Sequence, residues 1–390
     1  MPRCRMAQVT SGGHPRSGAS RPLIFWLDPA DRRYSSPPCI TSPRRSYTVS
    51  RVPRARVVIV AQNASTRVGG EAIIPVHYFQ ILRSRGADVH LIAHERNRAD
   101  LEHHFGGNMC GTEFVQDTCL HRLCDRLQKR TSSPLINHVA GNLLHVWNEW
   151  LGRARVLRLV RQAPASVVHL PTPVSPRAAS IMAGLGVPTV FGPMNGGMSY
   201  PPGYTDHHSR VQEVLVSIGR AVAWLANLVL PGKAMAARLL VANDRTRLAL
   251  PVAERGRVRK VVENGVRLNV WRDVGRAARE DEAFRIAFIG RLVQFKAVDV
   301  TLEALAEVRR RGLDVRLDLI GKGEEESHLR RLAATLGLDG VVSFLGVLGQ
   351  RDAAARLARS DALILNSLHD CGGAVVLEAM AAGLPVIASA

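Results

Sequence analysis

Short apolar runs alternate with longer amphipathic stretches along most of the chain. Residues 56–61 form the first apolar run, residues 71–85 have a helical pattern, and residues 88–93 form a second apolar run. Continuous apolar runs of this length are typical of strands buried on both faces of a parallel sheet. The pattern therefore predicts the beginning of a doubly wound α/β domain.

The alternation continues with less regular spacing as far as the Asn264-Gly265 pair, which predicts a turn. Helical patterns cover residues 115–160 and 211–240. Further strands are expected at the apolar runs 165–170 and 188–191, and a strand can begin at residues 239–242, near Asn243. Residues 258–264 close this unit. This first unit, residues 55–270, is expected to be one Rossmann-like domain.

After a polar segment, taken as a linker over residues 271–284, the pattern restarts. Five strands are expected at residues 285–289, 314–320, 341–345, 362–365 and 385–388, with helices at 297–311, 325–336, 350–360 and 374–382. The fold class predicted is α/β, with two Rossmann-like doubly wound domains and a cleft between them. The sequence stops at its last expected strand, so the second domain, residues 285–390, is expected to be incomplete.

Charge is unevenly distributed along the 390 residues, whose formal net charge is +19. Residues 1–56 hold eleven Arg and only two acids, Asp28 and Asp31. This composition predicts that residues 1–54 form a disordered extension, a transit-peptide-like segment, or a stretch upstream of the true start. The remaining excess of positive charge favours anionic ligands or membrane surfaces. Nucleic acid is not expected as a partner, because neither an aromatic RNA-binding signature nor zinc-finger spacing occurs.

Six scattered cysteines form no CxxC pair, and no histidine cluster completes a zinc motif. A reduced, cytoplasmic setting is the simplest interpretation. The most apolar stretch, Val214 to Leu230, is interrupted by Arg220. It predicts either a buried helix or an amphipathic helix at a membrane surface, so peripheral contact with the inner face of the membrane stays open.

The first candidate site is the loop that follows the expected strand 285–289. Arg291 and Lys296 both lie in this loop, ahead of a helix. Ligands of open α/β sheets bind at the carboxyl ends of the strands. An arginine fork and a lysine charge at that edge can hold a diphosphate, although two solvated cations explain the pattern equally well. Gly321 and Gly323 mark a second such loop, in which a plain tight turn is an equal explanation.

The segment at residues 366–387 carries the strongest signal. Asp370, Gly372 and Gly373 lie in a loop between a strand and a helix, and Glu378 lies within the apolar helix. Free amides and the dipole at the amino end of a helix favour an anion. A single acid among apolar neighbours on a helix favours a binding role, because its carboxylate can accept hydrogen bonds from sugar or ribose hydroxyls.

These segments resemble the large fourth family of retaining glycosyltransferases, which has the two-domain GT-B architecture. The resemblance rests on Gly-Arg-x4-Lys at 290–296, Gly-x-Gly at 321–323 and the segment 366–387. In the first domain, residues 63–72 and 191–198 resemble a bacterial branch of that family. The resemblance implies transfer of a sugar, with retention, from a nucleoside-diphosphate-sugar to a hydroxyl of a glycan or lipid-linked acceptor, in glycan, glycolipid or exopolysaccharide biosynthesis.

The resemblance also implies roles for single residues. Arg291, Lys296, Gly372 and Gly373 would bind the donor diphosphate, so neither a metal nor another cofactor is expected. Glu378 would hold the nucleotide ribose, and Asp370 would contact hydroxyls of the donor sugar. His169 would lie near the reacting sugar, although a core histidine is an equal interpretation. Four residues of the first domain would face the cleft and the acceptor: Gly69, Gly70, Glu71 and Asn195.

The chain departs from the family pattern at two positions. Asp370 replaces the longer Glu, which predicts a shifted hydroxyl contact, and Ala297 stands where Gly is usual. The sequence also lacks the closing helix that follows the last strand in the family. It therefore leaves open whether this chain is an active enzyme. A sugar-nucleotide epimerase and a non-catalytic fragment that binds nucleotide sugar are the alternatives. Hydride-transfer and hydrolase motifs are lacking.

Overall fold

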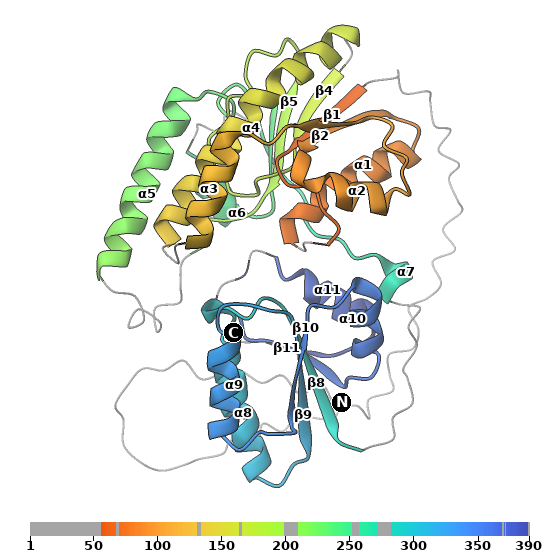
Figure 1. The fold of residues 1–390 in the computed structure, drawn as a ribbon, viewed down its shortest axis with the longest axis vertical. Coiled ribbons are helices and arrows are strands. Elements are labelled where there is room, and N and C mark those ends of the chain that lie inside the picture. Colours follow the sequence, from red (N-terminus) through yellow and green to blue (C-terminus); the bar gives the residue numbers. More distant parts are fainter. Residues whose placement is uncertain are drawn as a thin grey trace, which may run out of the picture.

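The computed structural model contains two parallel β-sheets, one in each half of the chain (Figure 1). It describes residues 56–67, 70–130, 134–163, 166–198, 210–251, 257–271, 282–368, 370 and 372–388. Every strand pairing within both sheets is parallel. The predicted fold class, two doubly wound α/β units, is therefore confirmed.

The first sheet has seven strands in the order β3-β2-β1-β4-β5-β6-β7. Its strands are β1 (Arg56–Ala61), β2 (Asp88–His94), β3 (Thr112–Val115), β4 (Ser166–Leu170), β5 (Thr189–Met194), β6 (Arg238–Val241) and β7 (Val258–Lys260). The order reverses between β1 and β4, so the loops after these two strands diverge and leave room for ligands at their carboxyl ends.

Helices cover both faces of this sheet. On one face, Val156 and Leu159 of α4 (Pro134–Gln162) pack against the central strands. On the other face, Phe79 of α1 (Ile74–Ser84) and Leu101 of α2 (Arg98–His104) form a second cluster with the strands. Both clusters are nearly free of solvent, which explains why the strands read as continuous apolar runs.

The second sheet has five strands in the order β10-β9-β8-β11-β12. They are β8 (Phe284–Ile289), β9 (Val315–Ile320), β10 (Val342–Gly346), β11 (Ala362–Leu365) and β12 (Val386–Ala388). The helices α8 (Val298–Arg310) and α9 (Glu326–Thr335) cover one face, and α10 (Gln350–Leu357) and α11 (Ala374–Ala381) cover the other (Figure 1). The short α7 (Leu268–Trp271) lies between the two sheets along the chain and packs on α10 and α11 through the buried Trp271.

The first half differs from the expectations in several details. The helical stretch expected at 115–160 is present as two helices, α3 (Cys119–Arg130) and α4, and the strand β3 before it was not expected. The helix expected at 211–240 is shorter, because α5 (Arg210–Val229) ends before Pro231, whereas the strand expected from residue 239 is present as β6. The short helix α6 (Asp244–Leu248), capped by Asn243, was not expected at all. Apolar side chains continue through these boundaries, whereas Pro and Gly end the helices.

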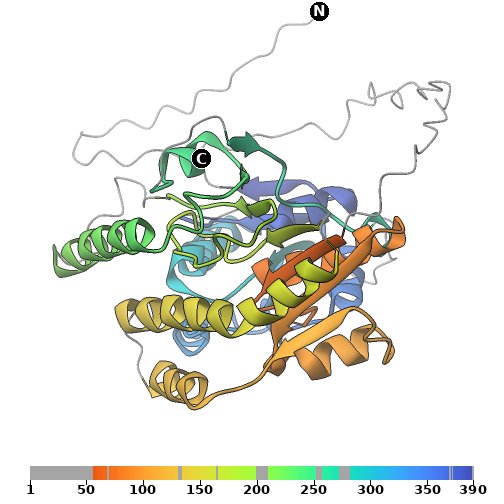
Figure 2. The same cartoon turned by 90° about the horizontal axis from the view of Figure 1, so that it is seen from above.

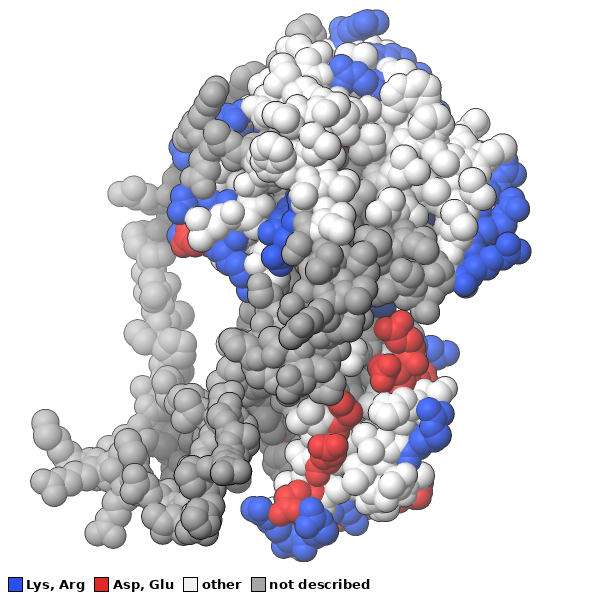
Figure 3. All heavy atoms as spheres, turned by 90° about the vertical axis from the view of Figure 1, so that its left-hand side faces the viewer, with Lys and Arg blue, Asp and Glu red and all other residues white. Residues whose placement is uncertain are grey.

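The helix α5 lies beside α4 and projects from the first sheet's side of the molecule (Figures 1 and 2). Within the described residues, no helix has the length and apolarity needed to cross a bilayer. The expected cytoplasmic location stays a prediction. Residues 285–390 contain thirteen basic and thirteen acidic residues, so the excess positive charge beyond residue 56 belongs to residues 57–284. Figure 3 shows mostly Lys and Arg among the charged side chains of the upper part, and both acidic and basic side chains on the lower part.

Candidate functional site

Two loops of the second half pack backbone against backbone at the carboxyl ends of β8 and β9. The amide of Leu292 donates to the carbonyl of Lys322 at 3.1 Å, and the amide of Glu325 donates to Leu292 at 3.0 Å. A Cβ added to Gly321 would lie 1.8 Å from the carbonyl oxygen of Gly290. Close approach of the two loops, and not a tight turn alone, therefore requires the glycine.

Lys296 and Asp370 form an ion pair that joins the β8 loop to the loop before α11. Their side chains are 13% and 29% exposed, so the pair is shielded from bulk water on most sides. The amide of Leu368 also donates to the carbonyl of Phe295 at 2.8 Å, which fixes the two loops together. The structure therefore brings together two of the residues that were predicted to hold the donor.

The residue after Lys296 has an unusual backbone. Ala297 caps α8 in the left-handed conformation, with φ 47° and ψ 45°, and it is the only described non-glycine residue with positive φ. An L-residue there costs about 1 kcal/mol relative to glycine. This strain explains why the resembling family usually has Gly at that position.

The amino end of α11 lies directly beside this pair in sequence and space. Gly373 is its N-cap residue, with φ 46°, and no side chain caps the helix. The first amides of α11 therefore lack a capping side chain and remain open to an anion. Arg291 lies on the neighbouring loop with an exposed side chain, and among the described residues its guanidinium has no recorded partner.

Glu378 is half-buried on α11, and its carboxylate makes no recorded hydrogen bond or ion pair with the described residues. Burial raises the pKa of its carboxyl to about 7. Near neutral pH this side chain can be a protonated carboxyl, which donates a hydrogen bond, or a carboxylate, which accepts. Ligand hydroxyls that replace water would stabilise either form. Its environment is the one expected for a binding group.

A polar network crosses between the two halves of the chain at Gly372. The side-chain amide of Asn264 donates to the carbonyl of Gly372 at 2.9 Å. Asn264 also donates to Glu263, whose carboxylate accepts a hydrogen bond from the buried Asn195. Asn195 accepts in turn from Asn243, at 3.3 Å. The predicted residues Asn195 and Gly372 are thus connected through residues that the sequence reasoning missed.

A cleft of about 450 Å³ lies over this network. It is lined by both halves of the chain, by Asn195, Ala242, Asn243, Val262, Glu263, Asn264, Gly372, Gly373, Val376 and Leu377. Burial raises the pKa of Glu263, and the nearby charge of Asp370 adds to this, while Asn195 and Arg245 act in the opposite direction. Glu263 and Asn264 follow β7, and this position at a strand's carboxyl end was the signal that could have revealed them.

His169 lies at the end of β4, but its ring is only 7% exposed. Its Nε2 donates to the carbonyl of Gly192 at 2.7 Å, and Tyr78 packs edge-on at 4.6 Å between ring centroids. Burial lowers the pKa of the imidazole, so the neutral form is favoured. These contacts support a structural part for His169 within the first domain, and its predicted contact with the reacting sugar stays a prediction.

The predicted acceptor loop is partly described. Gly69 lies outside the described residues, whereas Gly70 has φ 73° and precedes Glu71 in the 3-10 helix η1 (Gly70–Ile73). The carboxylate of Glu71 accepts a hydrogen bond from the amide of Val174 at 3.1 Å. Glu71 therefore joins this loop to the proline-rich segment after β4.

Lys233 is buried and hydrogen-bonds to the backbone of the same proline-rich segment. It is 3% exposed, and its ammonium group donates to the carbonyls of Ser175 at 3.1 Å and Pro176 at 2.8 Å. Burial lowers its pKa to about 7, against an opposing effect of Glu149. A lysine in an otherwise arginine-rich chain thus has a positioning role.

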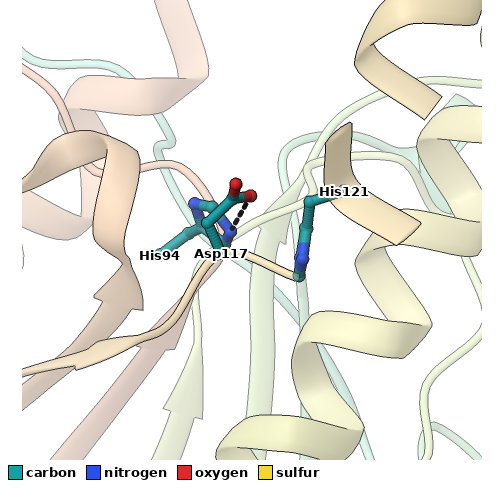
Figure 4. A group of neighbouring side chains, drawn as sticks. All are labelled: His94, Asp117 and His121. Carbon is teal, nitrogen blue, oxygen red and sulfur yellow. Dashed lines mark ion pairs between the residues drawn. The ribbon is translucent and has the colours of Figure 1, made fainter. Parts of the chain in front are cut away.

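One side-chain N or O atom from each of His94, Asp117 and His121 lies within 4.8 Å of the other two, at the amino end of α3 (Figure 4). Each imidazole accepts a backbone amide on Nδ1, His94 from Arg96 and His121 from Thr118, both at 3.2 Å. The neutral rings therefore carry their proton on Nε2, and a metal at Nε2 would break both bonds. The cluster carries no metal assignment, and the expected absence of a metal stays a prediction.

Comparison with known proteins points to one family. Residues 270–390 match the family described as Glycosyl transferases group 1. The D-inositol 3-phosphate glycosyltransferase of Streptomyces avermitilis is 35% identical over 153 residues, covering 35% of this chain and 33% of that protein. The lipopolysaccharide core biosynthesis glycosyltransferase LpsE of Rhizobium meliloti is 38% identical over 101 residues, covering 26% and 28%. The chain spans 26–39% of the length of the curated relatives it matches.

Solved structures match over more of the chain. The apo form of the lipopolysaccharide outer core galactosyltransferase WaaB has a TM-score of 0.52 at 14% identity, covering 85% of this chain and 80% of that one. Anabaena HepE in complex with UDP has a TM-score of 0.54 at 16% identity, covering 86% and 80%. These likenesses concern the fold. Residues 270–390 therefore match the group 1 glycosyltransferases, and the two halves of the chain have the two-domain fold of these solved structures.

Proposed function

We propose that the protein transfers a sugar from a nucleoside-diphosphate-sugar to a hydroxyl acceptor, with retention at the anomeric carbon. The observation that carries the proposal is the junction of Lys296, Asp370 and the uncapped amino end of α11, beside a cleft lined by both halves of the chain. A relative in fold, HepE, was crystallised with UDP and with UDP-glucose, which supports a nucleotide sugar as the donor.

The donor's charge is matched by this chain's own groups. The ammonium of Lys296, the guanidinium of Arg291 and the amides before Ala374 offer three sources of positive potential for a diphosphate. Such groups stabilise negative charge that develops on the leaving nucleotide. We therefore propose that transfer proceeds without a divalent metal, and that activity persists in excess EDTA.

The acceptor hydroxyl attacks the anomeric carbon on the face from which the diphosphate departs, and a diphosphate oxygen takes up the hydroxyl proton. The new C–O bond forms as the bond to the diphosphate breaks, so the nucleoside diphosphate carries away the electron pair. Asp370 holds donor hydroxyls and Glu378 holds the ribose, as the family resemblance implies. In this proposal Asp370 must share Lys296 with the incoming diphosphate, because the two side chains already form an ion pair.

Transfer is tested with the full chain, a panel of nucleoside-diphosphate-sugars and glycan or lipid-linked hydroxyl acceptors. Release of nucleoside diphosphate together with a product of retained anomeric configuration, read by NMR, supports the proposal. Isomerised donor without any acceptor product indicates the alternative epimerase, and nucleotide binding without consumption of donor indicates a binding module. Either of these results contradicts glycosyl transfer.

We also propose peripheral contact with an anionic membrane through α5. Six apolar side chains of this helix are each at least half exposed: Ile218, Val222, Trp224, Leu225, Leu228 and Val229. The excess of positive charge in residues 57–284 favours such a surface. Co-sedimentation with phosphatidylglycerol vesicles should fall when Trp224 and Leu228 are both changed to Ser, and unchanged binding would remove α5 as the contact.

A further inference from the structure

A second cavity, of about 640 Å³, lies between the two halves of the chain, away from the residues that line the first cleft. On one wall it is lined by Thr66, Arg67, Asp100, His103 and His104. The other wall is lined by Arg267, Asn269 and Val270 of the segment around α7, and by Gln350 and Arg351 of α10. Three guanidinium groups and two imidazoles thus surround a space that contains one carboxylate. The family resemblance assigned none of these residues.

The one carboxylate, that of Asp100, already accepts hydrogen bonds from the first half of the chain. Asp100 accepts hydrogen bonds from the hydroxyl of Ser65 at 2.5 Å and from the amide and hydroxyl of Thr66 at 2.8 Å and 3.1 Å. Burial alone would raise its pKa, but these hydrogen bonds lower it overall, so the carboxylate stays ionised. Its charge holds the loop that leads to Gly70 and Glu71, and it is also 3.5 Å from the guanidinium of Arg67.

The positive charges of Arg267 and Arg351, on the wall opposite Asp100, have no carboxylate partner in the part of the chain that the structure describes. Among the described residues, no carboxylate and no side-chain hydrogen bond is recorded for the guanidinium of Arg267 or of Arg351, although both side chains are exposed. The charge of Arg267 contributes, after burial, to lowering the pKa of both His77 and His104. An anion in the cavity would relieve this excess of positive potential.

The position of the cavity connects it to the acceptor. Its first wall is the loop Thr66–Arg67, which continues directly into the loop that the resemblance places on the acceptor side. Its other wall is formed by the segment around α7 and by the amino end of α10, whose first residues are Gln350 and Arg351. Figure 1 shows α2 of one half facing α7 and α10 of the other. A ligand bound here would contact both halves at once.

We propose that this cavity binds a phosphomonoester group carried by the acceptor, with Arg267 and Arg351 as its main contacts. The proposal rests on the glycosyl transfer proposed above and narrows its acceptor to phosphorylated polyols. A phosphomonoester offers three oxygens and close to two negative charges at neutral pH, which suits two guanidinium forks on the same wall of an open cavity. A neutral hydroxyl acceptor would leave both forks without a partner.

The test uses the full chain and isothermal titration with glycerol 3-phosphate, inorganic phosphate and glycerol. We expect both phosphates to bind and glycerol not to bind. Arg267→Gln and Arg351→Gln should each weaken phosphate binding by about tenfold. Arg331→Gln, which removes an exposed arginine of α9 outside the cavity, is the matched control and should change nothing. Unchanged phosphate binding in both cavity variants would overturn the assignment.

A second arm separates an acceptor's phosphate from a free anion. With nucleotide sugar present, mass spectrometry of a panel of polyol monophosphates and their unphosphorylated counterparts should show sugar added to phosphorylated members, and less in both cavity variants. Equal addition to the unphosphorylated members, or binding of inorganic phosphate with no transfer to any polyol phosphate, would overturn the acceptor assignment. Nucleoside diphosphate binding should be unchanged in the cavity variants. If the wild-type chain bound no nucleotide, the proposed function itself would fail, which is a distinct result.

Discussion

Replacing Glu378 by Gln should stabilise the protein and at the same time weaken nucleotide binding. Burial raises the pKa of this carboxyl to about 7, from a usual value of 4.5. The folded state therefore holds a proton that the unfolded state loses between these two pH values. Stability contributed by the protonated acid is present below pH 4.5 and is lost as pH rises through 7. Glutamine has the same shape and no charge, so it avoids this loss.

The pKa difference sets an upper limit of about 3 kcal/mol at pH 8. Because Glu378 is only half-buried and water screens it, we expect about 1–2 kcal/mol of added stability in Glu378→Gln at pH 8 and less at pH 5. Urea unfolding at both pH values measures this, with Trp fluorescence as the probe, since Trp271 packs in the same cluster as Ala379 of α11. Glu303→Gln, an exposed acid of α8, is the matched control.

Binding should change in the opposite direction. A carboxylate that accepts hydrogen bonds from ribose hydroxyls contributes about 1.5–3 kcal/mol, so the dissociation constant for nucleoside diphosphate should rise about 10–100-fold in the variant. A gain in stability with a loss of affinity is the pattern of a residue kept for binding. Two results would contradict this account of the buried acid. Glu378→Gln could be less stable than wild type at pH 8, or its free energy of unfolding could fall with rising pH as steeply as that of the wild type.

Three further changes test the site. Ala297→Gly should raise the free energy of unfolding by about 1 kcal/mol in urea titrations, because it relieves the left-handed φ of 47°; a loss of stability would refute the strain. Gly372→Ala should displace the side chains of Asn264 and Glu263, because its Cβ would lie 2.1 Å from the Nδ2 of Asn264 and from the Oε1 of Glu263; loss of the hydrogen bond from Asn264 should lower the free energy of unfolding in urea by about 1 kcal/mol, and an unchanged value would argue against the contact. Wild-type stability should rise from pH 7 towards pH 10 by at most about 1.4 kcal/mol per unit, because the pKa of Lys233 is lowered to about 7 by burial; Lys233→Met should lose that rise, and an equal slope in both proteins would exclude Lys233.

The alternation of elements was predictable because a parallel sheet buried on both faces leaves an unmistakable pattern. All five strands of the second sheet lie within a few residues of the expected runs. The strand β3 was missed because its four residues include Thr112 and Glu113, which face partly exposed positions and break the apolar run. The overlong helix at 211–240 arose because apolar residues continue past Pro231, where the backbone turns.

The site was predictable only where local sequence carries the chemistry. Lys296 and Asp370 were named from their loops, and the structure pairs them. Glu263 and Asn264 were interpreted as the end of the first unit and a turn, because their contact with Gly372 depends on how the two halves meet. Such contacts between segments about a hundred residues apart leave no periodic signal. The second cavity was missed for the same reason, since the residues that line it come from segments far apart in the sequence.

The central claim is that Lys296 and the amino end of α11 hold the diphosphate of a nucleotide sugar. The most direct measurement is calorimetric titration of wild-type protein and Lys296→Gln with UDP, GDP and ADP, and with the corresponding nucleosides. For whichever diphosphate binds, the account predicts at least about a tenfold loss of affinity in Lys296→Gln, with little change for the nucleoside. Equal affinity of the two proteins for that diphosphate, or equal losses for diphosphate and nucleoside, would contradict it.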